Sequence, residues 1–218
     1  MRAKYNAQML KKITNQLKKF PLDPAKPSPQ DSGDTAAVLL LLHGSNENPQ
    51  IVLTQRAMHL NNHAGEVAFP GGMWDTTDGS LLHTALRETH EEIGVPAGLV
   101  EPVAMLPVSS PKRRNLQVTP FVGLALGPLE FCCEPSEIAS IFDAPVSLFT
   151  DINNYDYFEI NNEVGALSFP CLPYNGYKIW GFTLNVIVDM LNATLESGID
   201  LKYPSDELIE ELRARGQQ

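Results

Sequence analysis

Hydrophobic side chains recur along the 218-residue chain with two periods, one typical of helices and one typical of strands. Near the N-terminus, apolar residues three or four positions apart predict an amphipathic helix over residues 3–20. Residues 81–93 show the same period, with Ser80 as a plausible N-cap and Gly94 as the terminator. Two more helices are expected over residues 180–196 and 205–215.

The remaining apolar runs are short and predict strands. The longest, residues 36–42, is far shorter than the about 20 residues that a membrane-spanning helix needs. Residues 69–80 are expected to form a long turn, and residues 134–142 a short helical turn. Strands are expected over residues 36–42, 50–56, 66–69, 101–108, 118–126, 156–161 and 166–170. Because strands and helices interleave without strict repetition, the pattern predicts an α/β fold, of the α+β kind, with a mixed β-sheet and helices on its faces.

The composition is that of one folded domain with an added N-terminal element. A 43% apolar fraction is enough for a core. We expect residues 1–34 to form the N-terminal amphipathic helix and a Pro-rich linker, and residues 35–218 to form the main domain. The cysteines are odd in number, and Cys132 and Cys133 are adjacent. They indicate reduced thiols and a cytoplasmic protein, and the N-terminus lacks the apolar stretch of a signal peptide.

Charge is distributed unevenly along the chain. Residues 1–20 carry six basic groups and no acidic ones, although the whole chain has a net charge of −10. An acidic main domain argues against nucleic acid as a partner and favours a small anionic substrate that arrives with metal ions. The basic helix is expected to pack on the domain. Contact with an anionic membrane is the less favoured alternative. Formation of a homodimer is a further alternative that the sequence leaves open.

Carboxylates are concentrated in the sequence "RETHEEIG", at residues 87–94. On a helix of 100° per residue, Glu88, Glu91 and Glu92 fall within about 100° of arc. Like charges at these spacings destabilise a helix by roughly 0.2–0.5 kcal/mol per pair. The cluster is either a solvated acidic face or a site for Mg²⁺ or Mn²⁺, which prefer oxygen ligands.

The stretch from Gly72 to Val95 resembles the Nudix box, written G-x5-E-x7-R-E-U-x-E-E-x-G-U with U aliphatic. Here Gly72 is followed by five residues, Asp78, eight residues and "RETHEEIGV". The departures are Asp78 in place of the first glutamate, a spacer one residue longer, and Thr89 in place of an aliphatic residue. The resemblance implies the Nudix fold, an α/β/α sandwich with a mixed β-sheet.

The preceding segment, "LTQRAMHLNNHAGEVAFPGG" at residues 53–72, is similar to one found in coenzyme A pyrophosphatases of the Nudix superfamily. Similarity to that subfamily extends over about residues 36–192, and Asn61 stands where the subfamily commonly has arginine. The resemblance implies Mg²⁺- or Mn²⁺-dependent hydrolysis of the diphosphate of coenzyme A or its derivatives. The products would be 4′-phosphopantetheine and adenosine 3′,5′-bisphosphate.

The resemblance also implies roles in catalysis and metal binding. Glu88, Glu91 and Glu92 would bind the metal, and Arg87 would orient these glutamates. The general base is either Glu92 or Glu137, and Glu137 could instead be a helix first-turn acid. Glu66 is either a further metal ligand or an exposed strand residue.

The substrate would be a small-molecule nucleotide held by another set of residues. Arg56 would contact phosphate, and Gly71 and Gly72 would let the backbone approach the metals. Arg113 and Arg114, in the basic loop "PKRRN", either bind the 3′-phosphate of coenzyme A or belong to a solvated loop. The spacing of His59 and His63 suits zinc, but Leu60 stands where a zinc-protease motif needs glutamate.

Two alternative functions stay open. The first is a Nudix hydrolase of another nucleoside diphosphate derivative, such as ADP-ribose or a dinucleotide. The second is a catalytically silent Nudix domain that senses a nucleotide. The presence of all three helix carboxylates favours an enzyme.

Overall fold

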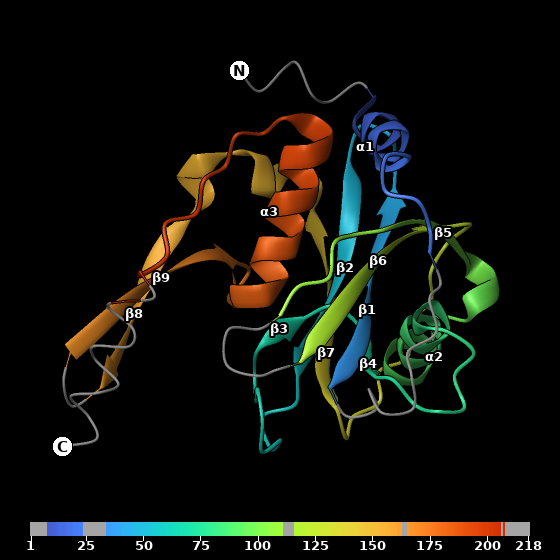
Figure 1. The fold of residues 1–218 in the computed structure, drawn as a ribbon, viewed down its shortest axis with the longest axis horizontal. Helices are drawn as coiled ribbons and strands as arrows, with labels where there is room; N and C mark the ends of the chain where they lie inside the picture. Colours follow the sequence, from blue (N-terminus) through green and yellow to red (C-terminus); the bar gives the residue numbers. More distant parts are fainter. Residues whose placement is uncertain (1–7, 24–33, 111–115, 163–164, 206, 208–218) are drawn as a thin grey trace.

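The computed structural model describes the chain except residues 1–7, 24–33, 111–115, 163–164, 206 and 208–218 (Figure 1). A mixed β-sheet forms the middle layer. Helix α2 (Leu81–Ile93) packs on one face of this sheet, and α1 (Met9–Leu17) and α3 (Gly181–Leu195) lie on the other. This arrangement confirms the expected α/β/α sandwich.

In the described part of the chain, the central sheet contains seven strands. They are β1 (Thr35–Gly44), β2 (Pro49–Arg56), β3 (Val67–Ala68), β4 (Gly71–Met73), β5 (Val100–Met105), β6 (Gln117–Ala125) and β7 (Ile138–Pro145). Five follow the order β3-β2-β1-β6-β5, while β4 pairs with β1 and β7 pairs with β2. Strands β1 and β6 are parallel and the other pairs antiparallel, so the sheet is mixed.

A second, antiparallel sheet lies beside α3 and extends away from the central layers (Figure 1). Its strands are β8 (Asp156–Asn162), β9 (Gly165–Tyr174) and β10 (Tyr177–Trp180). Short 3₁₀ turns span Ala97–Leu99, Val146–Thr150 and Ile152–Asn154. The second sheet packs against the α3 side of the molecule, since Leu172 and Ile179 belong to that core.

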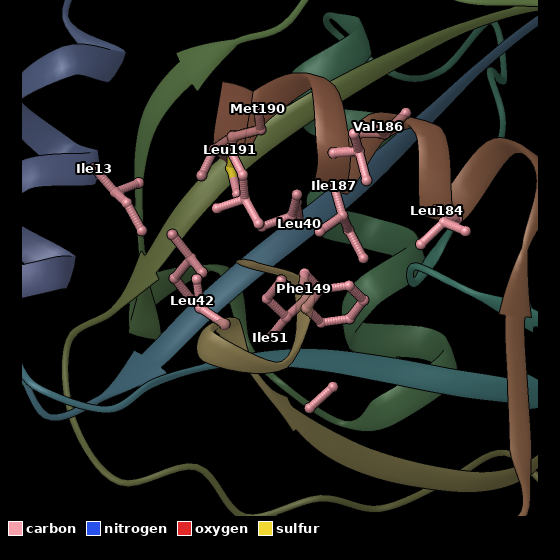
Figure 2. Packing of buried hydrophobic residues seen from close by; sticks show 14 of the residues in the cluster. Ile13, Leu40, Leu42, Ile51, Phe149, Leu184, Val186, Ile187, Met190 and Leu191 are labelled. Atoms are coloured by element: carbon pink, nitrogen blue, oxygen red, sulfur yellow. The ribbon is translucent and has the colours of Figure 1, made fainter. Parts of the chain in front are cut away.

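The core is divided by the central sheet into two clusters. Alternate residues of β1 face opposite sides, so Leu39 packs toward α2 while Leu40 and Leu42 pack toward α3. Figure 2 shows Leu40 and Leu42 among side chains of α3, together with Ile13 from α1. The run of leucines expected to be a buried strand is therefore buried on both faces.

Helix α1 uses its apolar stripe to pack on α3. Met9, Ile13 and Leu17 are buried in the α3-side core, while Lys11 and Lys18 are exposed. The helix thus packs on the domain, as expected from the sequence. Among the described residues, no helix combines the length and apolar character needed to cross a membrane.

Helix α2 has the bounds predicted from the sequence because its signals are local. The Ser80 Oγ accepts a hydrogen bond from the His83 N–H at 3.2 Å, which caps the first turn. At the other end, Gly94 has φ of 75°, a left-handed conformation that favours glycine. Its N–H donates to the His90 carbonyl, so the helix ends directly after Glu92 and Ile93.

Several element predictions were wrong or incomplete. The helical turn expected over residues 134–142 is a single turn that leads into strand β7. The long turn expected over 69–80 contains strand β4, and β10 was not expected. The strand expected over 66–69 is only Val67–Ala68. The helix expected over 3–20 is Met9–Leu17 among the described residues, and the one expected over 205–215 lies almost wholly outside them.

Candidate active site

The candidate site lies at the edge of the central sheet where β2 ends and where β4 pairs with the first residues of β1. Arg56 is the last residue of β2, and its register partner on β7 is Ile138. On β4, Gly72 pairs with Ala37 of β1 and faces α2. Strand β4 therefore lies against the second half of α2, and the end of β2 meets the start of β7 at the same edge of the sheet.

The double glycine permits very close contact between β4 and α2. A Cβ atom on Gly72 would lie 2.4 Å from Cδ of Glu88 and 2.6 and 2.7 Å from its two carboxylate oxygens. Next to it, the Gly71 N–H donates to Oε2 of Glu92 at 3.1 Å. Gly72 thus leaves room for the Glu88 carboxylate, and Gly71 hydrogen-bonds the Glu92 carboxylate. A Cβ atom at either glycine would come closer than 3 Å to neighbouring atoms.

The three glutamates of α2 occupy different environments. Glu92 is only 3% exposed, and burial, reinforced by the charge of Glu88, raises its pKa to about 8. Burial also raises the pKa of Glu88, which is partly buried. Glu91 is exposed. The three glutamates, which the sequence places on one side of the helix, therefore extend from the solvent-exposed surface into the protein interior.

Arg87 connects α2, called the box helix because it carries the residues that resemble the Nudix box, to the loop before it. Its guanidinium binds Asp78 through two bonds, Nε to Oδ1 at 3.0 Å and Nη2 to Oδ2 at 2.9 Å. Nη1 donates to Oε1 of Glu88 at 2.7 Å and to Oε2 of Glu91 at 2.9 Å. Asp78 is 1% exposed, so its carboxylate is removed from water. The guanidinium that Asp78 fixes in this way also positions Glu88 and the more exposed Glu91.

Replacing Arg87 with lysine is expected to destabilise the protein by about 3 kcal/mol, because the buried Asp78 carboxylate would lose its two parallel hydrogen bonds to the guanidinium. Asp78 would keep a nearby charge but not the paired hydrogen bonds. Urea unfolding of wild type and Arg87→Lys measures the difference. As a matched control, Lys18→Arg changes an exposed basic residue on α1 and should leave the free energy of unfolding unchanged. Equal stability of all three proteins would contradict the bracing role.

Arg56 contributes an unpaired donor beside the carboxylates. Its Nε is buried and has no hydrogen-bond partner among the described residues. The positive charge of Arg56 acts to lower the pKa of Glu92, while Glu137 acts to raise the pKa values of both Glu88 and Glu92. These electrostatic effects place Arg56 and Glu137 near the buried end of the carboxylate stripe.

Glu137 reaches the site through backbone contacts between segments far apart in the sequence. The Glu134 N–H donates to the Glu92 carbonyl at 3.0 Å, and the Cys132 N–H donates to the Ile93 carbonyl at 3.0 Å. The Ala57 N–H donates to the carbonyl of Glu137 at 2.8 Å. Spacing along the sequence does not reveal these bonds, because each of them joins segments that lie far apart in the chain.

Other candidate residues are placed differently. Oε2 of Glu66 lies 2.8 Å from Nδ1 of His63, within hydrogen-bond distance, and the other oxygen of this carboxylate is not part of that contact. His59 bonds the Ser136 carbonyl instead of pairing with His63. All three cysteines are free thiols, as the sequence indicated. Arg113 and Arg114 lie outside the described residues.

Comparison with known proteins identifies the family. The NUDIX domain model matches residues 33–148, more than half of the chain. The chain belongs to the Nudix family. It is therefore a Nudix hydrolase acting on the pyrophosphate bond of a nucleoside diphosphate derivative, in a family that generally uses divalent metal ions.

Nudix proteins of bacteria are also similar over most of the chain. "Uncharacterized Nudix hydrolase NudL" of Enterobacter sp. (strain 638) is 37% identical over 155 residues, covering 71% of this chain and 80% of that protein. The NudL protein of Salmonella paratyphi B is 35% identical over 142 residues, covering 65% and 73%. A MutT/nudix family protein from Enterococcus faecalis has a similar fold, with a TM-score of 0.50 and 18% identity over 87% of this chain and 70% of that one.

The Nudix helix offers oxygen donors that suit a divalent cation. The hydrogen bonds to Arg87 and Gly71 use Oε1 of Glu88, Oε2 of Glu91 and Oε2 of Glu92, one oxygen of each carboxylate. As these side chains lie, no three acidic, His or Cys groups among the described residues converge into a metal site. Arg87 holds two of the three carboxylates, so a cation would have to compete with its guanidinium. The carboxylate oxygens, together with an Arg56 Nε that has no partner among the described residues, fit a site that takes up a cation and an anion together.

Proposed function

We propose that this Nudix hydrolase cleaves the diphosphate of coenzyme A or its derivatives in a Mg²⁺- or Mn²⁺-dependent reaction. The proposal rests on residues 53–72, which are similar to the segment that precedes the box in coenzyme A pyrophosphatases. This segment supplies Arg56 and the double glycine to the site. The observation that carries the proposal is the buried Nε of Arg56, which lies beside an acidic cluster and has no hydrogen-bond partner in the part of the chain that the structure describes. Such a donor fits a phosphate oxygen.

Glu88, Glu91 and Glu92 would hold the divalent cation. When bound, the cation neutralises phosphate charge and lowers the pKa of a water molecule. Arg87 would act by holding Glu88 and Glu91 in position, since its guanidinium is already bound to Asp78. The same guanidinium is thus engaged inside the protein and unsuited to binding the substrate.

The proton of the attacking water needs an acceptor, and Glu137 and Glu92 are the candidates. Glu137 is exposed and acts electrostatically on Glu88 and Glu92, so it can meet a water that enters with the substrate. In the proposed reaction the water oxygen bonds to one phosphorus while the bond from that phosphorus to the bridging oxygen breaks. The proton goes to Glu137, and the bridging oxygen leaves with the other phosphate.

Two further assignments complete the proposal. Arg113 and Arg114 would bind the 3′-phosphate that distinguishes coenzyme A from most nucleoside diphosphate derivatives. Residues 35–218 would form the hydrolase domain, with residues 1–34 as an added N-terminal element. The packing of α1 on α3 supports a role for this element in stabilising the domain.

A panel of substrates tests the proposed function. With Mg²⁺ present, wild type should convert coenzyme A to 4′-phosphopantetheine and adenosine 3′,5′-bisphosphate, with kcat/KM about tenfold or more above that for ADP-ribose. Products are separated by chromatography, and ¹⁸O-labelled water identifies the phosphorus that is attacked. Chelation with EDTA should abolish the reaction.

The rival functions predict other outcomes of the same panel. Asn61, which stands where the subfamily commonly has arginine, favours a different nucleoside diphosphate derivative as the second candidate. Faster cleavage of ADP-ribose or a dinucleotide than of coenzyme A would replace the proposed substrate. Binding of nucleotides with no Mg²⁺-dependent turnover would instead indicate a sensor domain.

A further inference from the structure

A short turn carries Glu137 to the site, and its own hydrogen bonds make it compact. Oε1 of Glu134 accepts from the Ser136 N–H at 3.2 Å and from the Ser136 hydroxyl at 2.7 Å. The Ile138 N–H donates to the Glu134 carbonyl at 2.8 Å. These bonds define the shape of the turn, but they do not fix where the turn sits relative to α2 and β2.

Backbone bonds attach this turn to the elements on either side of the site. The Glu134 N–H reaches the Glu92 carbonyl on α2, and the Glu137 carbonyl receives the Ala57 N–H, just beyond β2. The turn therefore spans the gap between the box helix and the strand that ends at Arg56. Because both bonds are made by the backbone, side-chain substitution does not remove either of them.

His59 adds a side-chain bond to the same turn. Its Nε2 lies 3.1 Å from the Ser136 carbonyl oxygen. A carbonyl oxygen only accepts, so Nε2 must carry the proton and donate it. The acceptor belongs to the peptide unit that joins Ser136 to Glu137, so this bond restrains the backbone directly at the base of the Glu137 side chain.

We propose that His59 is a positioning residue for Glu137. It acts by fixing the Ser136–Glu137 peptide against the segment after β2, and it does not contact the reacting atoms itself. The inference rests on the proposed function, in which Glu137 accepts the proton of the attacking water. Loss of the bond lets the Glu137 carboxylate move away from its productive position while substrate binding is retained.

Steady-state kinetics of four single variants and one double variant test this role, with whichever compound of the panel (coenzyme A or ADP-ribose) wild type cleaves faster. His59→Ala should lower kcat about tenfold with KM changed less than about twofold, as expected when a reacting group loses its orientation. His59→Gln places an amide N–H close to the position of Nε2 and should restore most of the activity. His90→Ala, which changes an exposed histidine of α2, is the matched control and should behave as wild type.

Glu137→Gln and the double variant together separate positioning from a general structural effect. Glu137→Gln should itself lower kcat, and adding His59→Ala to it should cause no further loss, because the two residues act as one unit. Multiplicative losses, full activity of His59→Ala, or failure of His59→Gln to restore kcat would each overturn the inference. Normal turnover of Glu137→Gln, or no turnover of either compound by wild type, would also overturn it. Failure with coenzyme A alone would refute only the proposed substrate.

Discussion

Replacement of Glu92 by glutamine is expected to lower turnover by about 10³-fold or more, because both proposed roles of Glu92 require a negative charge. Glutamine keeps the size of the side chain, and its carbonyl oxygen can still accept the Gly71 N–H that Oε2 accepts in wild type. The charge that attracts a divalent cation is lost. The measurement is kcat at saturating Mg²⁺ and substrate. Turnover within threefold of wild type would show that Glu92 is neither a metal ligand nor the base.

Stability of the metal-free protein provides the control for this variant. Burial raises the pKa of Glu92 to about 8 from the ordinary value of 4.5. The folded state therefore binds a proton that the unfolded state has released, so this group makes stability fall as pH rises from about 4.5 to about 8. Glutamine removes that dependence. In EDTA, urea unfolding should show Glu92→Gln at least as stable as wild type at pH 8.5. A variant that is less stable there would contradict the buried, protonated state.

Replacement of Gly72 by alanine is expected to reduce kcat by about 100-fold, an effect typical of a misplaced reacting group. The new methyl group would lie 2.4 Å from Cδ of Glu88, a distance that requires something to move. The carboxylate is the far end of a flexible side chain and yields more readily than the backbone of β4. Activity should therefore fall much more than stability, as measured by kcat and by thermal unfolding.

Gly79→Ala is the matched control for Gly72→Ala. Gly79 lies in the same connection between β4 and α2, but a Cβ built there meets no atom within 4 Å. This substitution should leave both kcat and the melting temperature unchanged. If the two alanine variants behave alike, the close contact between Gly72 and Glu88 has no functional importance.

Helix α2 was predictable because all the information needed lies within its own sequence and its two ends. Ser80, Gly94 and the spacing of apolar residues between them specify a helix without reference to the rest of the chain. The three clustered glutamates could be recognised for the same reason. Their unequal burial could not, because the contacts that bury Glu92 and Glu88 come from Gly71 and Gly72 on another element.

Strands β4 and β7 were missed because their partners are distant in the sequence. β4 is only three residues long and contains two glycines, yet Gly71–Met73 pair with Ala36–Val38 of β1. Residues 134–142 begin with a genuine helical turn, and only pairing with β2 makes the following residues a strand. The position of Glu137 depends on that pairing, which explains why its neighbours could not be inferred from spacing alone.

The location of α1 has a practical consequence. The Leu10 N–H donates to the Asn46 carbonyl, in the connection between β1 and β2. That connection is at the opposite end of the sheet from Arg56 and β4 (Figure 1). A protein immobilised through an exposed residue of this helix, such as Lys11, would be held by the end of the sheet remote from Arg56 and β4, and we expect it to keep its turnover.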